Sequence, residues 1–232
     1  NSSRIIAVSN HVSDYLTKKW NISSNKIGIV NHGLTKETKS KMPDGLRGVK
    51  NFFFTAGSIR PARGLSVLIN SFSEINQLYP DFKLVIAGSC DDIMQGYYNR
   101  LQKVISKQGL SDKVVWLGNL LPEEMNYCYK SCHTFFMTSL AEACPNIVME
   151  SISNKCVTIS NDVRPMPDFY KKNAFYYNNN NKYSLLNSVK ERMSLDKKQE
   201  SILKENLHQL SKSYCWKTCF EKTEQELITA IS

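Results

Sequence analysis

Short apolar runs rich in β-branched and aromatic residues alternate along the chain with longer amphipathic segments. The apolar runs have the length of strands, and the amphipathic segments have the length of helices. This alternation is typical of an α/β fold, in which helices flank a Rossmann-like parallel sheet. Strands are predicted at residues 4–9, 26–30, 51–56, 83–87, 114–117, 134–137, 157–160 and 174–177, and helices at residues 12–20, 65–78, 97–108, 123–130, 145–153, 183–193 and, with a break, 197–231.

The pattern divides the chain near residues 31–33. Residues 36–49 contain several Lys and Gly residues together with Pro and Thr, a composition that predicts a linker or a long loop. Residues 1–33 then form a strand-helix-strand unit, and residues 34–232, including the final long helices, form the main domain.

Length and composition bound the class of protein. A chain of 232 residues with 41% hydrophobic and 22% charged residues can bury a core, so a disordered or fibrous protein is excluded. No apolar run reaches the roughly 18 residues that a membrane-spanning helix requires. The first residues lack an initiator Met and a secretory signal, so we expect a cytoplasmic segment cut from a longer chain.

The formal net charge of +9 favours anionic partners such as phosphates and acidic lipid surfaces. Peripheral contact with the cytoplasmic face of a membrane is therefore one expectation. Nucleic acid is not expected as a partner, because no Lys/Arg stripe with interleaved aromatic residues occurs. The seven cysteines include no Cys-x-x-Cys pair, which favours reduced thiols packed in the core over a metal site. No nucleophile pattern surrounds His11, His32, His133 or His208, and none is assigned a catalytic role.

The loop after the 51–56 strand carries two arginines between glycines. Gly57 and Ser58 open it, Arg60 and Arg63 follow, and Gly64 precedes a predicted helix. Guanidinium groups and free amides at a helix start form an anion site. The loop is neither a Walker loop nor Gly-x-Gly-x-x-Gly, so phosphate binding and a solvated basic turn are both open interpretations.

Two further strands end in glycine. Gly88 follows the 83–87 strand, and Gly118 follows the 114–117 strand. A glycine at such a turn allows a ligand or another part of the backbone to approach closely. The adjacent Asp91 and Asp92 point to opposite faces if the chain is extended, so no metal site is inferred.

The loop after the 134–137 strand leads into the helix predicted at 145–153. Proline suits the first helical position, so Pro145 would leave the amides of Asn146, Ile147 and Val148 without intrahelical partners. Those amides could bind an anion or a sugar oxygen.

Two carboxylates belong to the same segment. Glu142 lies in the loop, and Glu150 lies about 7.5 Å along the helix axis from Pro145. The neighbours of Glu150 are apolar, so the helix is expected to be largely buried and an inward carboxylate would need a partner. We therefore expect the two carboxylates at different depths of one cleft.

These motifs, in this order, resemble the C-terminal, donor-binding half of a retaining glycosyltransferase of family 4, which has the GT-B fold. Glu142 and Glu150 match the family's Glu-x7-Glu pair, and residues 57–64 match its Gly-Arg-x4-Lys-Gly loop. Residues 84–89, 114–118 and 157–169 match the strands and turns that accompany them. The resemblance implies that residues 1–33 are the remnant of an N-terminal acceptor domain.

The resemblance also implies roles for residues. Glu142 and Arg63 would be catalytic: Glu142 would contact the transferred sugar, and Arg63 would neutralise the departing diphosphate. Glu150 would hold the ribose hydroxyls. The remaining donor-binding residues would be Ser58, Arg60, Gly57, Gly64, Gly88, Gly118, Asn146, Ile147 and Val148.

No metal and no cofactor is implied, because cations and helix amides can balance the charge of the leaving phosphate. The partners would be a nucleoside diphosphate sugar and a glycan or lipid-linked acceptor, with retention of the anomeric configuration. Without an acceptor domain, the chain alone is expected to be inactive or weakly active.

Departures from the family pattern keep alternatives open. Ser58 stands where the family has Arg, and Arg60 could substitute for it. Lys155 stands where the family has Gly. The alternatives are another GT-B enzyme, such as a nucleotide-sugar epimerase or a starch/glycogen synthase-like transferase, and a non-catalytic nucleotide-binding or interaction module.

Overall fold

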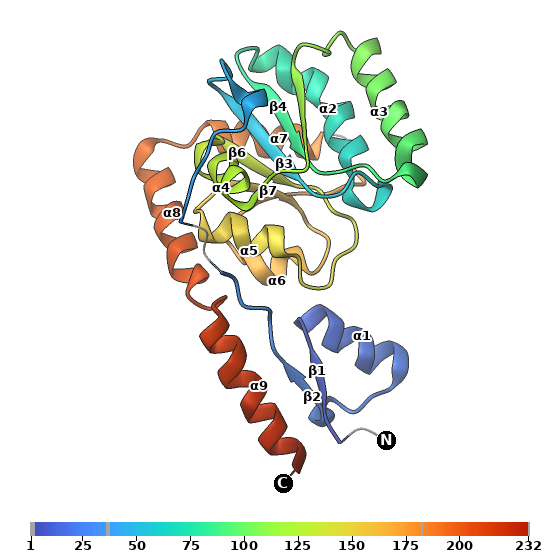
Figure 1. Cartoon of the computed structure of the whole chain (residues 1–232), viewed down its shortest axis with the longest axis vertical. Helices are drawn as coiled ribbons and strands as arrows, with labels where there is room; N and C mark the ends of the chain where they lie inside the picture. Colours follow the sequence, from blue (N-terminus) through green and yellow to red (C-terminus); the bar gives the residue numbers. More distant parts are fainter. Residues whose placement is uncertain (1–2, 36–37, 182, 232) are drawn as a thin grey trace.

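The computed structural model describes residues 3–35, 38–181 and 183–231. Strands and helices alternate through most of this length (Figure 1). Each described strand pairing is parallel. The described residues form a small sheet near the N-terminus and a larger sheet in the main body.

The larger sheet contains six strands from the described part of the chain, in the order β5-β4-β3-β6-β7-β8. Strand β4 pairs with one side of β3, and β5 pairs with β4. Strand β6 then pairs with the other side of β3. Such a reversal leaves a crevice at the carboxyl ends of the two central strands. The strands are β3 Phe52–Ala56, β4 Lys83–Ala87, β5 Val114–Gly118, β6 Thr134–Met137, β7 Thr158–Asn161 and β8 Phe175–Tyr177.

Strand β3 is buried on both faces. Successive side chains on a strand point to opposite faces, so Phe53 packs in one layer while Phe52 and Phe54 pack in the other. The Phe53 ring stacks on Phe82 with 4.7 Å between centroids and meets Phe136 edge-on at 5.5 Å. A continuous apolar run suits this position, because helices cover both faces of a parallel sheet.

Helices from separate parts of the chain supply the two layers. The layer around Phe53 includes α2 Leu65–Leu78, α3 Gln95–Lys107 and α7 Ser184–Met193. The layer around Phe54 includes α4 Pro122–Ser131, α5 Asn146–Ser153, α6 Met166–Tyr170 and α8 Lys197–Ser211. Helix α2 shows why they pack: its apolar residues recur every three or four positions and form one buried stripe, namely Leu65, Leu68, Ile69, Phe72 and Ile75.

The small sheet pairs β1 Ile5–Ala7 with β2 Ile27–Ile29, and α1 Asn10–Trp20 connects them. Helix α9 Trp216–Ile231 extends from the main body to this unit, as Figure 1 shows. Glu226 on α9 forms an ion pair with Arg4. At the other end of α9 the indole Nε1 of Trp216 donates to Thr35 Oγ1 at 3.0 Å. Helix α9 therefore ties the small sheet to the main body.

Each predicted strand and helix occurs among the described residues, with ends within two residues of the prediction. The predicted parallel α/β fold is confirmed. Helix α6 was not predicted, because prolines at 165 and 167 indicate a turn; proline is nevertheless tolerated in the first helical turn, and α6 begins there. Short 3-10 turns occupy Ser24–Lys26, Asp44–Leu46, Pro61–Arg63 and Asp92–Met94.

The predicted linker at residues 36–49 is a packed loop over most of its length. Residues 36 and 37 lie outside the described part. Beyond them, the Lys41 amide donates to the Glu123 carbonyl at 3.0 Å, and the Leu46 side chain is buried in the main core. The segment therefore contacts the body on which the central pocket is built.

Shortening a buried side chain of β3 should test how much the core contributes to stability. We expect Phe53→Ala to lower the free energy of unfolding by about 3–5 kcal/mol, because a fully buried ring would be replaced by a cavity. Chemical denaturation measures the loss. Ile93→Ala, at a side chain that is 89% exposed, serves as the control and should change the value by no more than about 0.5 kcal/mol. Equal midpoints for the two variants would contradict the account.

Candidate functional site

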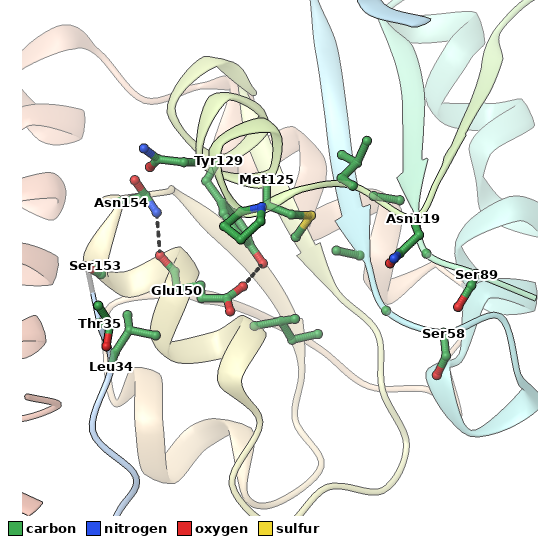
Figure 2. A pocket seen from close by; sticks show the side chains of 18 residues that line it. Leu34, Thr35, Ser58, Ser89, Asn119, Met125, Tyr129, Glu150, Ser153 and Asn154 are labelled. Carbon is green, nitrogen blue, oxygen red and sulfur yellow. Dashed lines mark hydrogen bonds between the residues drawn. The ribbon is translucent and has the colours of Figure 1, made fainter. Parts of the chain in front are cut away.

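A pocket of about 360 Å³ opens at the carboxyl ends of β3, β4 and β5. We call it the central pocket (Figure 2). It lies on the β4 and β5 side of the crevice that the reversal between β3 and β6 predicts, and its lining includes no residue of β6. Its wall includes the starts of the loops after those strands, one side of α4, and α5. The lining residues are Leu34, Thr35, Ala56, Gly57, Ser58, Ala87, Gly88, Ser89, Asn119, Leu120, Pro122, Met125, Asn126, Tyr129, Ile147, Glu150, Ser153 and Asn154.

Glycines let the backbone form the floor of the central pocket. Gly57 and Gly88 have φ values of +130° and +144°, in the region that favours glycine. A Cβ on Gly88 would lie 1.9 Å from the Gly57 carbonyl oxygen, so no side chain fits between these loops. The Gly88 amide donates to the Gly118 carbonyl at 2.7 Å. Gly118 thus stabilises the turn at Gly88 through this hydrogen bond and does not itself line the pocket.

Helix α5 brings Glu150 into the central pocket. Val148, Met149 and Ile152 are fully buried against the sheet, which fixes the rotation of the helix. Residues three and seven positions apart share a helix face, and Ile147, Glu150 and Asn154 accordingly line the pocket together. The buried environment expected around Glu150 is confirmed.

Tyr129 on α4 is the partner of Glu150. Its hydroxyl donates to Glu150 Oε2 at 2.9 Å, and Figure 2 shows the two side chains meeting at the pocket wall. Burial raises the pKa of the Glu150 carboxyl, and the bond from Tyr129 partly offsets this rise. Burial also raises the pKa of Tyr129, so its hydroxyl keeps the proton that it donates.

Arg63 and Glu142 form an ion pair beside the central pocket. Arg63 follows β3 and Glu142 follows β6, so the pair spans the point where the strand order reverses. Ser139 Oγ accepts a second bond from the Arg63 guanidinium at 3.2 Å. Burial, and then the nearby charge of Arg60, lower the pKa of Arg63. The guanidinium remains a cation, because its ordinary pKa lies far above neutral pH.

The backbone also joins these two loops. Thr138 Oγ1 donates to the Arg63 carbonyl at 2.6 Å, and the Leu140 amide donates to the Ala62 carbonyl at 2.8 Å. Gly64 has a φ of +66°, and a Cβ there would lie 2.1 Å from the Thr138 carbonyl oxygen. Gly64 is therefore required for close contact between the loops and does not line the pocket.

The structure brings only some of the predicted site residues together. Gly57, Ser58, Gly88, Ile147 and Glu150 line the central pocket. Arg63 and Glu142 do not line the pocket but lie beside it. A Cβ placed on Gly57, which does line the pocket, would be 3.2 Å from Arg63 Nε. The remaining predicted residues, Arg60, Gly64, Gly118, Asn146 and Val148, are outside the lining.

One local expectation at α5 needs correction. Pro145 is the N-cap of α5 and not its first helical residue. Its carbonyl therefore accepts a bond from the Val148 amide at 3.1 Å, so Val148 does not offer a free amide. The expected cluster of three amides is reduced to those of Asn146 and Ile147. In the first loop, Arg60 Nε donates to Ser58 Oγ at 2.7 Å. The Arg60 guanidinium therefore lies next to Ser58, which lines the pocket.

Sequence reasoning missed Tyr129 and Asn154. Both contact Glu150, since the Asn154 side-chain amide donates to the Glu150 carbonyl at 3.0 Å. Tyr129 belongs to the apolar stripe of α4 and is indistinguishable there from an ordinary core residue. The only signal was indirect, namely the need of a buried carboxylate for a hydrogen-bond donor.

The described residues contain neither a cluster of metal ligands nor a membrane-spanning helix. Within residues 3–35, 38–181 and 183–231, no three or more His, Cys, Asp and Glu side chains are grouped as metal ligands would be. In the same ranges no helix has the length and apolar character needed to cross a membrane.

Comparison with curated proteins finds glycosyltransferases. An uncharacterized glycosyltransferase, MJ1059 of Methanocaldococcus jannaschii, is 31% identical over 115 residues, which are 50% of this chain and 27% of that protein. The O-antigen chain mannosyltransferase RfbU of Salmonella typhimurium is 22% identical over 80% of this chain and 50% of its own length. A human phosphatidylinositol N-acetylglucosaminyltransferase chain is 26% identical over 70% of this chain and 33% of its own length. The chain thus spans half or less of these relatives.

Solved structures share the fold. The Anabaena protein Alr3699/HepE, in complex with UDP and glucose, superposes with a TM-score of 0.85 at 16% identity, over 98% of this chain and 63% of that one. A glycosyltransferase from Rickettsia africae gives a TM-score of 0.84 at 16% identity, over 99% and 64% of the two chains. The large sheet with its flanking helices is therefore that of GT-B glycosyltransferases.

The family comparison covers most of the main domain. A family model described as glycosyl transferases group 1 matches residues 37–209, a range that includes the six strands of the larger sheet and, apart from Leu34 and Thr35, the residues that line the central pocket. Because this match extends over more than half of the sequence, the chain belongs to the glycosyl transferases group 1 family.

Proposed function

We propose that this chain is the donor-binding half of a retaining glycosyltransferase of family 4 and that its substrate is a nucleoside diphosphate sugar. The observation that carries the proposal is Glu150, a carboxylate at the wall of a pocket whose floor is glycine backbone. Carboxylates accept hydrogen bonds from paired hydroxyls, which is what a ribose presents. The similar fold of Alr3699/HepE, which was solved with UDP and with UDP-glucose, supports the same class of ligand.

In this proposal the nucleoside lies against Glu150, and the diphosphate extends from the pocket toward Arg63. The guanidinium and the amides of Asn146 and Ile147 then stabilise the negative charge that develops on the leaving diphosphate. Glu142, which lies beside Arg63, contacts the transferred sugar. These cationic and amide groups give a charge balance that involves neither a metal nor a cofactor.

The acceptor side of the reaction belongs to the whole protein. We propose a glycan or lipid-linked acceptor, since the names of two relatives specify an O-antigen chain and phosphatidylinositol. Residues 1–33 would be the end of an acceptor-binding domain, and the chain alone would bind donor but transfer sugar poorly. We place the protein in the cytoplasm, where its net charge of +9 would favour an anionic membrane surface.

Calorimetry with a panel of nucleosides, nucleoside diphosphates and nucleoside diphosphate sugars tests the proposal directly. At least one diphosphate should bind more tightly than its nucleoside. A chain that binds no member of the panel would contradict the proposal and favour a non-catalytic interaction module. For the whole transferase, an inverted anomer in the first-formed product would contradict the retaining assignment.

Glu150→Ala should weaken binding of the preferred nucleoside diphosphate by about 10- to 100-fold, because hydrogen bonds from the ribose to a carboxylate would be lost. The measurement is a calorimetric dissociation constant. Glu74→Ala, which removes an exposed carboxylate on α2, is the matched control and should bind like the parent protein. An unchanged affinity in Glu150→Ala would remove Glu150 from the site.

Binding of the preferred nucleoside diphosphate should also weaken on acidification. Tyr129→Phe should change the pH at which the affinity is lost. The pKa of Glu150 is raised by burial, so the carboxylate is lost at a higher pH than for an exposed Glu. The phenol of Tyr129 opposes that rise, and its removal should shift the affinity midpoint to higher pH. Affinity measured across an acidic pH series tests this, and a midpoint at the same pH in both proteins would contradict the role of Tyr129.

Arg63→Met and Glu142→Gln should have different effects on diphosphate affinity and so distinguish the roles of the two residues. Arg63→Met should weaken nucleoside diphosphate binding by about tenfold or more while leaving nucleoside binding unchanged. Glu142→Gln should bind the diphosphate at least as tightly as the parent, because a carboxylate that competes for Arg63 is removed. Parallel losses of diphosphate affinity in the two variants would contradict the assigned roles.

A further inference from the structure

A second cavity, of about 210 Å³, adjoins the central pocket and shares Tyr129 and Asn154 with it. It is bounded by the end of α4 and the start of β6, by the turn between α5 and β7, and by α7 and α8. We call it the basic pocket, after four cationic side chains in its lining. They come from four separate segments and are Lys130, Lys155, Arg192 and Lys204.

The charge in the basic pocket is not balanced. Glu200 is the one carboxylate that the described residues contribute to the lining. It pairs with Arg192 at 3.0 Å and with Lys204 at 2.6 Å. Lys130 and Lys155 have no carboxylate within 4.0 Å among residues 3–35, 38–181 and 183–231. An excess of three positive charges therefore faces this small cavity.

Arg192 is buried at the edge of the basic pocket and is incompletely bonded. Its side chain is 3% exposed, and its Nη2 donates to the His133 carbonyl at 2.9 Å. Its Nε is buried without an acceptor in the described part of the chain. Buried polar groups in proteins are nearly always hydrogen-bonded. The side chain with this unpaired nitrogen is also one of the cations that line the basic pocket.

His133 adds a neutral ring to the lining. Burial, and then the charge of Arg192, lower its pKa to about 4. The ring is therefore uncharged at neutral pH, and the excess positive charge comes from the lysines and Arg192 alone. An anion in the basic pocket would favour the protonated ring and raise the pKa of His133. This histidine offers a local spectroscopic probe.

We propose that the basic pocket binds a small, multiply charged anion of the phosphate or diphosphate class, at a site separate from the central pocket. Arg192 supplies a buried guanidinium, and Lys130, Lys155 and Lys204 supply ammonium groups. Four cations from separate segments suit a ligand with more than one negative charge better than a single carboxylate. The proposal depends on neither Glu150 nor the binding of a nucleotide.

The test uses the full chain and inorganic phosphate, followed by NMR of the histidine ring protons. Saturable binding should shift the His133 signal, identified by its loss in His133→Gln, and should leave the His11 and His208 signals in place. Sodium acetate at equal ionic strength should produce no such shift. Absence of saturation, or an equal response to acetate, would overturn the proposal.

Variants locate the site. Lys130→Ala combined with Lys155→Ala should weaken phosphate binding by about tenfold or more, and it leaves the ion pairs of Arg192, Glu200 and Lys204 intact. Lys197→Ala combined with Lys198→Ala, at exposed positions on α8, removes the same charge and should leave the affinity unchanged. Equal losses in the two double variants would indicate general electrostatics and refute the site.

Arg63→Met separates this inference from the proposed function. Because Arg63 lies beside the central pocket, phosphate binding at the basic pocket should persist in this variant. If Arg63→Met abolishes phosphate binding and the Lys130/Lys155 variant does not, the anion occupies the central pocket and the inference is wrong. Failure of nucleotide binding in the parent protein would leave the result at the basic pocket unaffected.

Discussion

Burial of β3 on both faces, in the middle of a parallel sheet, is the constraint on which the structure depends. Phe53 fixes one layer and Phe54 fixes the other, so neither face of the strand is free for solvent. Since the described strands of the sheet run in the same direction, their loops leave at one edge. The loops after β3 and β6 then have to lie next to each other, and the Arg63–Glu142 pair lies between them.

The same core fixes the acidic side of the central pocket. Helix α5 presses one face against the sheet, which leaves Glu150 on the opposite face and within reach of Tyr129. A half-buried carboxylate is costly unless a donor stabilises it, and the phenol supplies that donor. Rotation of α5 by one position would move the carboxylate into the apolar layer. The packing of α5 against the sheet therefore also determines that Glu150 faces the pocket.

Low sequence identity alongside a common fold has a physical explanation. The TM-score of 0.85 with Alr3699/HepE accompanies only 16% identity. Apolar residues can be exchanged within a layer when volume and pattern are preserved, whereas close contacts between loops tolerate few changes. The contact of Gly88 with the Gly57 carbonyl is of this second kind, and so is the contact of Gly64 with the Thr138 carbonyl.

The sequence by itself determined the order, type and approximate ends of the strands and helices, because hydrophobic periodicity is a local property that survives into the folded state. It also identified Glu150 as a carboxylate in need of a partner. Only the tertiary structure decided that this partner is Tyr129, that Pro145 caps α5, and that Arg63 pairs with Glu142. The Tyr129–Glu150 and Arg63–Glu142 contacts join residues from different elements, and their geometry depends on how two layers of helices pack on one sheet. The start of α5 depends on backbone angles at Pro145 that the sequence pattern does not fix.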